Sequence, residues 1–527
     1  MNELTGAWIL LRFTVRRDWV RIVVWISSIT AVVVLTAASI KTLFPTQAAL
    51  DQAAAVSANN AAAIAFNGPV QGLDTVGGEV AFQSGTFGLI LVALMSLLMI
   101  GRYTRAEEES GRTELLRATV LGRHAQTAAA LVVVTAMNLV IAVATAACLI
   151  LQGLPAVGSV SFGASFLAIG AVFGALALVT TQVSENGRVA SGMAGAVVGY
   201  AFVTRAVGDI GDGRLSWLSP IGWSQKPRPF AGERWWPYLV PATVTVVLLL
   251  VAAMLTTRRD YGAGLVRPRP GPAVAAPSFG SPLGLAARVQ RGTVIAWTVG
   301  LFVLGFVYGA IASDIGDFVG DNETLKELMA AAGGASITEA YFGTAMLTCA
   351  LVAAGFAVQS VLRLRAEETA LHAEYVLATP ASRHRWIASH LIIAVGGSTA
   401  VLAAVGLGAG IPYAVQVSDP GQVPRLAGAA LAYLPAVWLL VGIATALFGL
   451  VPRAVAVTWV IVAGCFVIGF LGEVLRLNRW IMNLSPFQHT PRLPAADFTP
   501  TPLLVQLAVA AALTAIGIAA FRRRDIG

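Results

Sequence analysis

The chain has 527 residues, of which 57% are hydrophobic and 12% are charged, whereas an average soluble domain carries about 25% charged residues. Its mean hydropathy is +0.76, and apolar runs recur from near residue 20 to residue 521. This composition excludes a water-soluble fold and leaves no room for a separate soluble catalytic domain. The net charge of +8 comes almost entirely from arginines beside the apolar runs, which is typical of cytoplasmic loops rather than of a nucleic-acid-binding surface.

The residues before the first apolar run have the pattern of an amphipathic helix. Apolar side chains recur at helical spacing on one side, and arginines are expected opposite them: Leu4, Trp8, Leu11, Val15 and Trp19 against Arg12, Arg16 and Arg17. This pattern predicts a helix lying on the inner leaflet. The apolar run near 22–40 has no clear small-residue cleavage site, so we interpret it as a retained signal anchor.

Twelve apolar segments of about the 20 residues that a bilayer core requires follow in chain order. They cover approximately 20–40, 82–102, 125–151, 160–182, 188–206 and 238–256, then 293–313, 340–361, 386–410, 426–450, 453–471 and 501–521. We therefore expect an all-α integral membrane protein with about twelve transmembrane helices. The three cysteines, Cys148, Cys349 and Cys465, each lie alone inside such a segment, so neither a disulfide nor a metal site is predicted.

The arginines predict the orientation of these segments, because cytoplasmic loops carry an excess of positive charge. The N-terminus is rich in arginine, whereas the loop 41–81 contains only Lys41. The N-terminus, residues 103–123, the linker and the C-terminus are therefore expected inside, with 45–75 and 315–335 outside. One loop, 207–237, is expected outside although it is basic. Its four tryptophans indicate an interfacial or re-entrant element.

A Pro/Gly-rich stretch, 263–282, separates two halves at 1–262 and 283–527. RAEEESGRTELLRATVLGRH at 105–124 aligns without a gap on RAEETALHAEYVLATPASRH at 365–384, with nine identities in twenty positions. Arg258-Arg259-Asp260 likewise matches Arg523-Arg524-Asp525. Each half has six spans, so the two halves are parallel repeats.

The repeated polar segments, 105–123 and 365–384, are candidate docking helices on the cytoplasmic side. Each carries both signs of charge and a short apolar pair, Leu115-Leu116 or Tyr375-Val376. Gly122 could end the first copy in a left-handed cap, and Pro380 restricts continuation of the second. The alternative is a solvated loop helix that only satisfies the positive-inside rule.

These segments resemble the cytoplasmic motif of ABC-2 type exporter transmembrane subunits, and in particular the duplicated actinobacterial permeases described as exporters of polyketide antibiotics. The motif of Glu, Gly, Glu, Leu-Leu, Pro and Arg reads Glu108, Gly111, Glu114, Leu115, Leu116 and Arg123 in the first copy, with Val120 in place of proline. The second copy reads Glu368, Glu374, Tyr375, Val376, Pro380 and Arg383, with Leu371 in place of glycine.

The resemblance implies that each segment is a coupling helix that docks on an ATP-binding subunit. It further implies a multi-pass plasma-membrane exporter of amphiphilic compounds, such as antibiotics and other drugs or lipids, that contributes to antibiotic resistance. The family places an amphipathic helix before the first span and short re-entrant helices between the fifth and sixth spans, which would explain the loop 207–237 and its counterpart near 472–500.

The sequence contains no Gly-Lys dipeptide and therefore no phosphate-binding loop of the G-x-x-x-x-G-K-[ST] type. We expect no catalytic residue and no cofactor in this chain. ATP and Mg²⁺ would bind to two copies of a separate subunit under the two coupling helices.

Ionisable residues within the spans are nearly absent, and the exceptions are Glu79 and Glu339 at the outer ends of the second and eighth spans. Each could line a substrate exit, or could simply be favoured by the helix dipole. Large apolar residues on the same two helices could line an adaptable cavity, or could be ordinary packing: Phe82, Phe87, Met95, Met99, Phe342 and Met346.

Two other classes of protein fit the sequence less well. A twelve-helix secondary transporter of the major facilitator type is also a parallel repeat of six plus six spans, but it would show a Gly-rich Asp/Arg motif after the second span where this chain has acidic segments. A membrane-embedded enzyme would need a cluster of His, Asp or Glu at a membrane face, and the sequence shows none.

Overall fold

A computed structural model describes residues 3–59, 61–111, 121–259, 262–266, 271–312, 337–471 and 478–524. Apart from one isolated bridge between Ser184 and Val266, this part of the chain consists of helices, turns and loops. The chain divides into two compact units, Met1–Pro270 and Gly271–Gly527, and each unit is described by itself.

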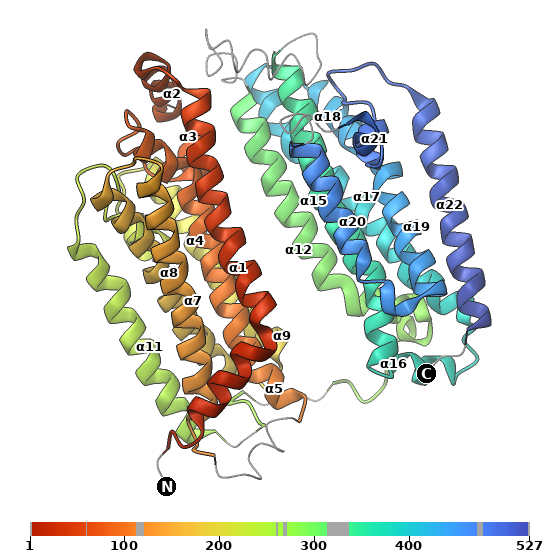
Figure 1. The fold of residues 1–527 in the computed structure, drawn as a ribbon. Coiled ribbons are helices and arrows are strands. Elements are labelled where there is room, and N and C mark those ends of the chain that lie inside the picture. The colour runs from red at the N-terminus through yellow and green to blue at the C-terminus, as the bar shows by residue number, and fades with distance from the viewer. Residues whose placement is uncertain are drawn as a thin grey trace. The chain divides into compact units, whose positions relative to one another are not determined.

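The first unit is a bundle of long helices that run roughly along one direction (Figure 1). Its long helices are α1 (Ala7–Leu43), α4 (Val76–Tyr103), α7 (Ala125–Leu151), α8 (Ala156–Val183), α9 (Gly187–Ile210) and α11 (Leu239–Arg258). Its short helices are α2 (Gln47–Asn59), α3 (Ala61–Asn67), α5 (Arg105–Glu109), η1 (Leu215–Leu218), α10 (Pro220–Gln225) and η2 (Trp236–Tyr238). In Figure 1, α2 and α3 lie at one end of the unit, and α5 lies at the other, near the N-terminus.

The second unit repeats this arrangement. Its long helices are α12 (Pro282–Ile311), α15 (Ile337–Thr369), α17 (Arg383–Gln416), α19 (Leu434–Leu450), α20 (Val457–Leu471) and α22 (Pro500–Arg523). Its short helices are η3 (Pro277–Gly280), α16 (His372–Leu377), α18 (Gln422–Leu431), η5 (Pro452–Ala454), α21 (Arg479–Met482) and η6 (Pro486–His489). Helix α16 lies at the same end of this unit as the C-terminus (Figure 1).

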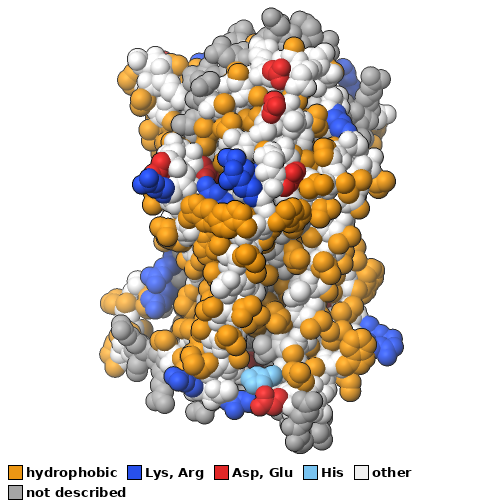
Figure 2. Space-filling view, turned by 90° about the vertical axis from the view of Figure 1, so that its left-hand side faces the viewer, with side chains coloured by type: hydrophobic (Ala, Val, Ile, Leu, Met, Phe, Trp, Pro, Cys, Tyr) orange, Lys and Arg blue, Asp and Glu red, His pale blue; other side chains and the backbone are white. Residues whose placement is uncertain are grey.

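The helices are those of an integral membrane protein. The described residues include 11 helices that are long and apolar enough to cross a membrane, and α20 is a shorter apolar helix within the eleventh predicted segment, 453–471. Hydrophobic side chains cover much of the middle of the face shown in Figure 2, and most charged side chains on it lie nearer its two ends. The expectation of an all-α membrane protein with about twelve spans is therefore confirmed.

The order of packing is the same in the two units. In the first unit α1 packs on α7, α4 on α8, and α8 on α11. The corresponding contacts in the second unit join α12 to α17, α15 to α19, and α19 to α22. The second spans, α4 and α15, are the most buried in their units, whereas the last spans, α11 and α22, bury little of their surface. Each unit therefore has its second span at the centre and its last span at the edge.

The loops between the fifth and sixth spans contain the short helices that the family resemblance predicts. In the first unit these are η1, α10 and η2, and the rings of Trp217 and Trp236 stack at a centroid distance of 5.5 Å. In the second unit they are α21 and η6. The repeated Leu-Ser-Pro sequence starts a short helix in both units, because Pro220 and Pro486 occupy the first helical turn.

Candidate functional site

We call the two repeated polar segments, 105–123 and 365–384, the first and second coupling segments. The first begins directly after α4. Helix α5 holds Glu108, and Gly111 follows in the left-handed conformation with φ of 70°. The predicted residues Glu114, Leu115 and Leu116 lie outside the described residues. Arg123 is exposed immediately before α7.

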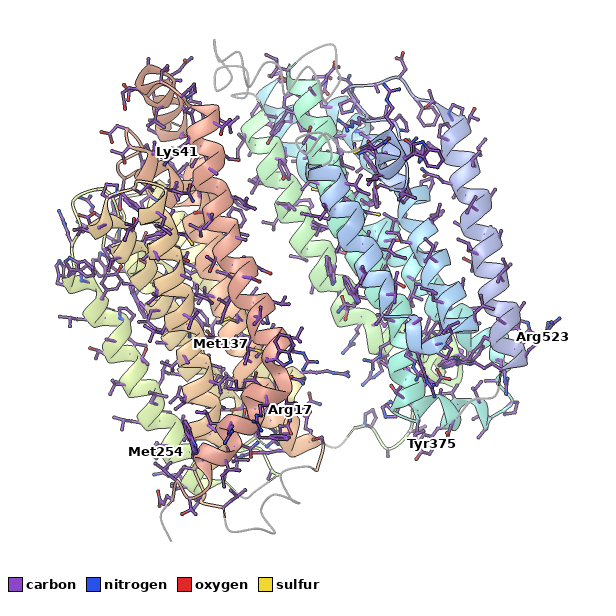
Figure 3. All side chains as sticks on the ribbon, in the orientation of Figure 1. Arg17, Lys41, Met137, Met254, Tyr375 and Arg523 are labelled. Carbon is purple, nitrogen blue, oxygen red and sulfur yellow. The ribbon has the colours of Figure 1, made fainter. Side chains whose placement is uncertain are left out.

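The second coupling segment is described along its whole length. Glu374 and Tyr375 lie on α16 and are exposed, with 77% of Tyr375 accessible, while Val376 is half-buried and Pro380 is exposed. Figure 3 shows Tyr375 and Arg523 at the same end of the unit. An exposed aromatic side chain beside a carboxylate at the polar end of a membrane bundle is typical of a protein-binding surface.

Two cavities flank α16. One of about 530 Å³ lies between the segment 279–282 and the residues that follow α16, and one of about 320 Å³ lies between the first turns of α12 and the start of α17. Both are lined by Pro282, Leu285, Tyr375 and Val376. The predicted apolar pair of the second segment therefore separates two hollows.

The two segments make the same backbone turn although the residue at its centre differs. Leu371 has φ of 60° and donates its N–H to the Glu368 carbonyl at 3.0 Å. Gly111 makes the equivalent bond to the Glu108 carbonyl at 3.1 Å. In both units the left-handed residue ends a helix, which is the usual place for glycine. The sequence motif lacks glycine in the second copy, but the turn is retained.

The prediction of a left-handed cap at Gly122 is wrong, because Gly122 is not among the residues with positive φ. The residue is instead confined by close backbone contact. A Cβ atom there would lie 2.8 Å from the Leu4 nitrogen and closer still to the Glu3 carbonyl. The N–H of Gly122 donates to the Thr5 carbonyl at 3.0 Å. Glycine is needed here for space rather than for its backbone angle.

Four of the predicted motif residues bind within their own unit. Glu108 pairs with Arg259 at 2.7 Å, and Glu368 pairs with Arg524. Arg123 and Arg383 donate to carbonyls at the ends of α11 and α22 respectively. Their predicted contact with a partner stays a prediction, but the structure gives each of them an internal role.

The N-terminal helix is continuous with the first span and bends at Asp18, which has non-helical angles of φ −111° and ψ 18°. Asp18 is buried and accepts hydrogen bonds from Arg17, Arg21 and Arg102. Arg17 also pairs with Glu107 of α5 at 2.9 Å. The helix before the first span is thus tied to the first coupling segment by charge.

The predicted separation of apolar residues and arginines on opposite sides of this helix is wrong for Arg12 and Arg16. Trp8 and Trp19 are 73% and 59% exposed, and Arg12 and Arg16 are exposed as well. At 100° per residue, Arg12 and Arg16 follow Trp8 by 40° and 80°, so they lie beside the tryptophans rather than opposite them. A surface of this kind suits the headgroup region, where aromatic rings and arginines lie side by side.

The carboxylates predicted to lie on a substrate pathway occupy different surroundings. Glu79 is buried in the first turn of α4, and one of its oxygens accepts a hydrogen bond from Gln83 at 2.6 Å. Its other carboxylate oxygen is buried without a hydrogen-bond partner in the described residues. Glu339 pairs with Arg425 at 2.5 Å. A place on the substrate pathway stays a prediction for both residues.

Most of the apolar pathway candidates are buried inside their own units. Met95, Met99, Phe342 and Met346 are at most 2% exposed, as ordinary core packing requires. The other two differ. Phe82 lines a small cavity of about 30 Å³ beside α8 and α10, and the exposed Phe87 packs edge-on against Phe66 at 4.8 Å. A pathway role for these six side chains stays a prediction.

Sequence reasoning missed a buried ion pair in the fifth span. Arg205 is fully buried and lies 3.5 Å from Asp209, one helical turn further on. It also donates to the Ala65 carbonyl at 2.7 Å and to the Phe66 carbonyl at 3.2 Å, at the end of α3. The signal in the sequence was an arginine and an aspartate four residues apart near the end of an apolar segment.

The fold and the spans define a multi-pass membrane protein, and comparison with known proteins identifies its family. A family model described as the C-terminal domain of the multidrug efflux system permease Rv1217c matches residues 279–522. The chain is 41% identical to the multidrug efflux system permease protein Rv1217c of Mycobacterium tuberculosis over 528 residues, covering 100% of this chain and 96% of that protein. The chain therefore belongs to the family of multidrug efflux permeases that contains Rv1217c.

Proposed function

We propose that this chain is the membrane-spanning subunit of an ATP-driven ABC-2 type exporter of amphiphilic compounds, such as antibiotics and other drugs, with lipids as an alternative cargo. Full-length similarity to a multidrug efflux permease supports the export of such compounds. The observation that carries the assignment to an ATP-driven exporter is the repeat of the coupling segment. Its second copy exposes the carboxylate of Glu374 and the ring of Tyr375.

The hydrolysis of ATP is assigned to a partner, because the sequence contains no phosphate-binding loop of the P-loop type. Two copies of an ATP-binding subunit would dock, one on each coupling segment. The hollows on both sides of Tyr375 and Val376 supply a shaped surface for the second copy. We expect the isolated chain to bind no nucleotide, and micromolar ATP binding to the purified chain would contradict this assignment.

One observation favours the alternative of a secondary transporter. The buried Arg205–Asp209 pair in the fifth span is of the kind that proton-coupled transporters use. However, both residues bind their neighbours, since Arg205 donates to carbonyls of α3 and Asp209 accepts a hydrogen bond from Ser216 at 2.6 Å. Within the described residues, Arg205 Nε and Asp209 Oδ2 have no hydrogen-bond partner. We therefore propose that the pair holds α3 and η1 against α9.

Transport into everted membrane vesicles, prepared from cells that produce this chain, distinguishes an ATP-driven exporter from a secondary transporter. For an ATP-driven exporter, ethidium uptake into the vesicles requires hydrolysable ATP and persists when a protonophore collapses the proton gradient. For a secondary transporter, uptake stops with the protonophore while ATP is still present. Vesicles from a strain that lacks this chain give the background. Uptake that depends only on the proton gradient would refute the ATP-driven mechanism.

A further inference from the structure

Each unit joins its coupling segment to its own last span at two points. The first point, which we call the carboxylate anchor, is a glutamate held between two arginines: Arg105, Glu108 and Arg259 in the first unit, and Arg365, Glu368 and Arg524 in the second. The second point, the arginine anchor, is Arg123 in the first unit and Arg383 in the second.

In the carboxylate anchor of the first unit, both oxygens of Glu108 are bound by arginines. Arg259 approaches Glu108 with two nitrogens, at 2.9 and 2.7 Å, and Arg105 approaches the same carboxylate at 2.6 Å. Arg105 is 1% exposed and also donates to the Gly262 carbonyl at 2.9 Å. Arg259 donates to the Ala263 carbonyl at 2.9 Å. The residues that follow α11 are thus bound directly to α5.

The carboxylate anchor of the second unit uses the equivalent residues. Arg365 contacts Glu368 at 3.0 Å, and Arg524 binds the other carboxylate oxygen. Arg524 also donates to the Phe448 carbonyl at 3.1 Å, and its guanidinium lies over the rings of Phe448 and Phe521 at 5.1 and 5.5 Å. The same three charges therefore join the second span to the end of the last span in both units.

The arginine anchor holds the other end of each coupling segment. Arg123 donates to the Thr256 carbonyl at 2.8 Å, in the last turn of α11. Arg383 donates to the Arg522 carbonyl at 3.1 Å and to the Arg524 carbonyl at 2.7 Å, at the end of α22. Arginine is favoured at these carbonyls because they are unpaired in the helix and carry its negative dipole end.

The anchors matter because each last span packs mainly on one other long helix, closely in the case of α22, whose Gly517 lies against the backbone of α19. Within the described residues, α11 packs mainly on α8 and α22 mainly on α19. Only 11% of the apolar window of α11 and 22% of that of α22 are buried. A helix that rests on one neighbour and is bound at its cytoplasmic end to another element follows that element when it moves.

We propose that the two anchors of each unit transmit movement of the coupling segment to the last span of the same unit. The proposal rests on the proposed function, because a partner must push on the coupling segment. Glu108 and Glu368 act as positioning residues: they contact neither substrate nor nucleotide, and they work by holding the arginine of the last span. The side chains of Glu108 and Glu368 are only 11% and 6% exposed, so little of either is open to a partner. Breaking the anchors should therefore leave the partner bound but its ATP hydrolysis poorly converted into transport.

The test uses the complex of the full chain with its ATP-binding subunit in proteoliposomes, with ethidium as the transported probe. Glu108→Gln combined with Glu368→Gln removes the negative charge from both carboxylate anchors while keeping the shape of the side chains. We expect the complex to assemble and the ATP hydrolysed per ethidium transported to rise at least fivefold. The control Asp212→Asn, in an exposed ion pair with Arg214, should change this ratio less than twofold.

A second variant covers the case in which the buried substitutions prevent folding. Arg123→Gln with Arg383→Gln breaks the arginine anchors, and because Arg123 is exposed and Arg383 half-buried, the chain should still fold. We expect a two- to threefold rise in the same ratio. An unchanged ratio in an assembled variant would overturn the proposal. A wild-type complex without ATP-driven transport would instead overturn the proposed function, and this proposal with it.

Discussion

The close contact between α12 and α17 allows the cost of one methyl group to be predicted. Gly305 and Gly309 are four residues apart on α12, the small-xxx-small spacing that lets membrane helices approach closely. A Cβ atom at Gly309 would lie 2.7 Å from the Ala409 carbonyl carbon and 2.8 Å from its Cα, and closer still to its oxygen. These are backbone atoms of α17, so no side chain can turn aside to make room.

The expected magnitude follows from these distances. Ordinary carbon contacts begin near 3.4 Å, so Gly309→Ala requires the two helices to separate by at least 0.7 Å, which is the difference between 3.4 and 2.7 Å. Overpacking of this kind costs about 1–3 kcal/mol. Gly300, on the same helix, has no atom within 4 Å of its Cβ position. Gly300→Ala should therefore stabilise the helix by roughly 0.5–1 kcal/mol, the usual gain of alanine over glycine.

The assay is reversible unfolding of the purified chain in mixed micelles with increasing SDS. We expect Gly309→Ala to lower the free energy of unfolding and Gly300→Ala to raise it slightly, so the two variants should differ by about 1.5–4 kcal/mol. If Gly309→Ala is as stable as Gly300→Ala, the contact of α12 with α17 is not as close as described, and the reasoning is refuted.

Three further predictions concern the coupling segments and the orientation of the chain. Leu371→Gly should raise and Gly111→Ala lower the melting temperature, because a left-handed conformation costs a residue with a side chain about 1–2 kcal/mol; identical melting temperatures would count against the shared turn. In a cysteine-free background, a membrane-impermeant maleimide applied to intact cells should label Asp51→Cys but not Ser110→Cys, and the reverse pattern would invert the predicted orientation. Glu374→Arg should weaken co-purification of the ATP-binding subunit at unchanged abundance, and an unaffected yield would reduce α16 to a solvated loop helix.

The spans could be predicted from the sequence because hydropathy and bilayer thickness constrain them directly. Eleven of the twelve predicted segments correspond to long apolar helices, in one case to two helices in series, and the segment 453–471 corresponds to the shorter helix α20. The predicted span 426–450 begins in α18 and continues as α19, with Pro435 in the first turn of the second helix. Proline is accommodated in a first turn, where its missing N–H would have no partner.

The anchors could not be predicted, because hydropathy does not pair charges that are far apart in the sequence. Glu108 and Arg259 are 151 residues apart, and Glu368 and Arg524 are 156 apart. The internal repeat did mark all four residues by matching them between the halves. It could not show that the matched glutamates and the matched arginines bind one another, so the glutamates alone were assigned a function.

The buried position of Arg205 could not be predicted for the same reason. Hydropathy scales disfavour an arginine within a span, yet Arg205 is buried in α9. Its guanidinium compensates for burial with the carboxylate of Asp209 and the carbonyls of Ala65 and Phe66. Those carbonyls belong to α3, which precedes it by 140 residues.

The two coupling segments differ in what holds them, and this difference bears on how they respond to a partner. The first is tied to the N-terminal helix through Glu107 and Arg17, and its turn contains glycine. The second has Leu371 in the same left-handed conformation, at a cost of about 1–2 kcal/mol that its neighbours must offset. The carboxylate anchor at Glu368 lies three residues before this turn, and His372, directly after it, contacts Glu367 at 3.0 Å. A force applied to α16 therefore acts on a turn that gains free energy by leaving its conformation, whereas the same force on the first segment acts on an unstrained turn that is also tied to the N-terminal helix. Equal pushes on the two segments should move the second one further.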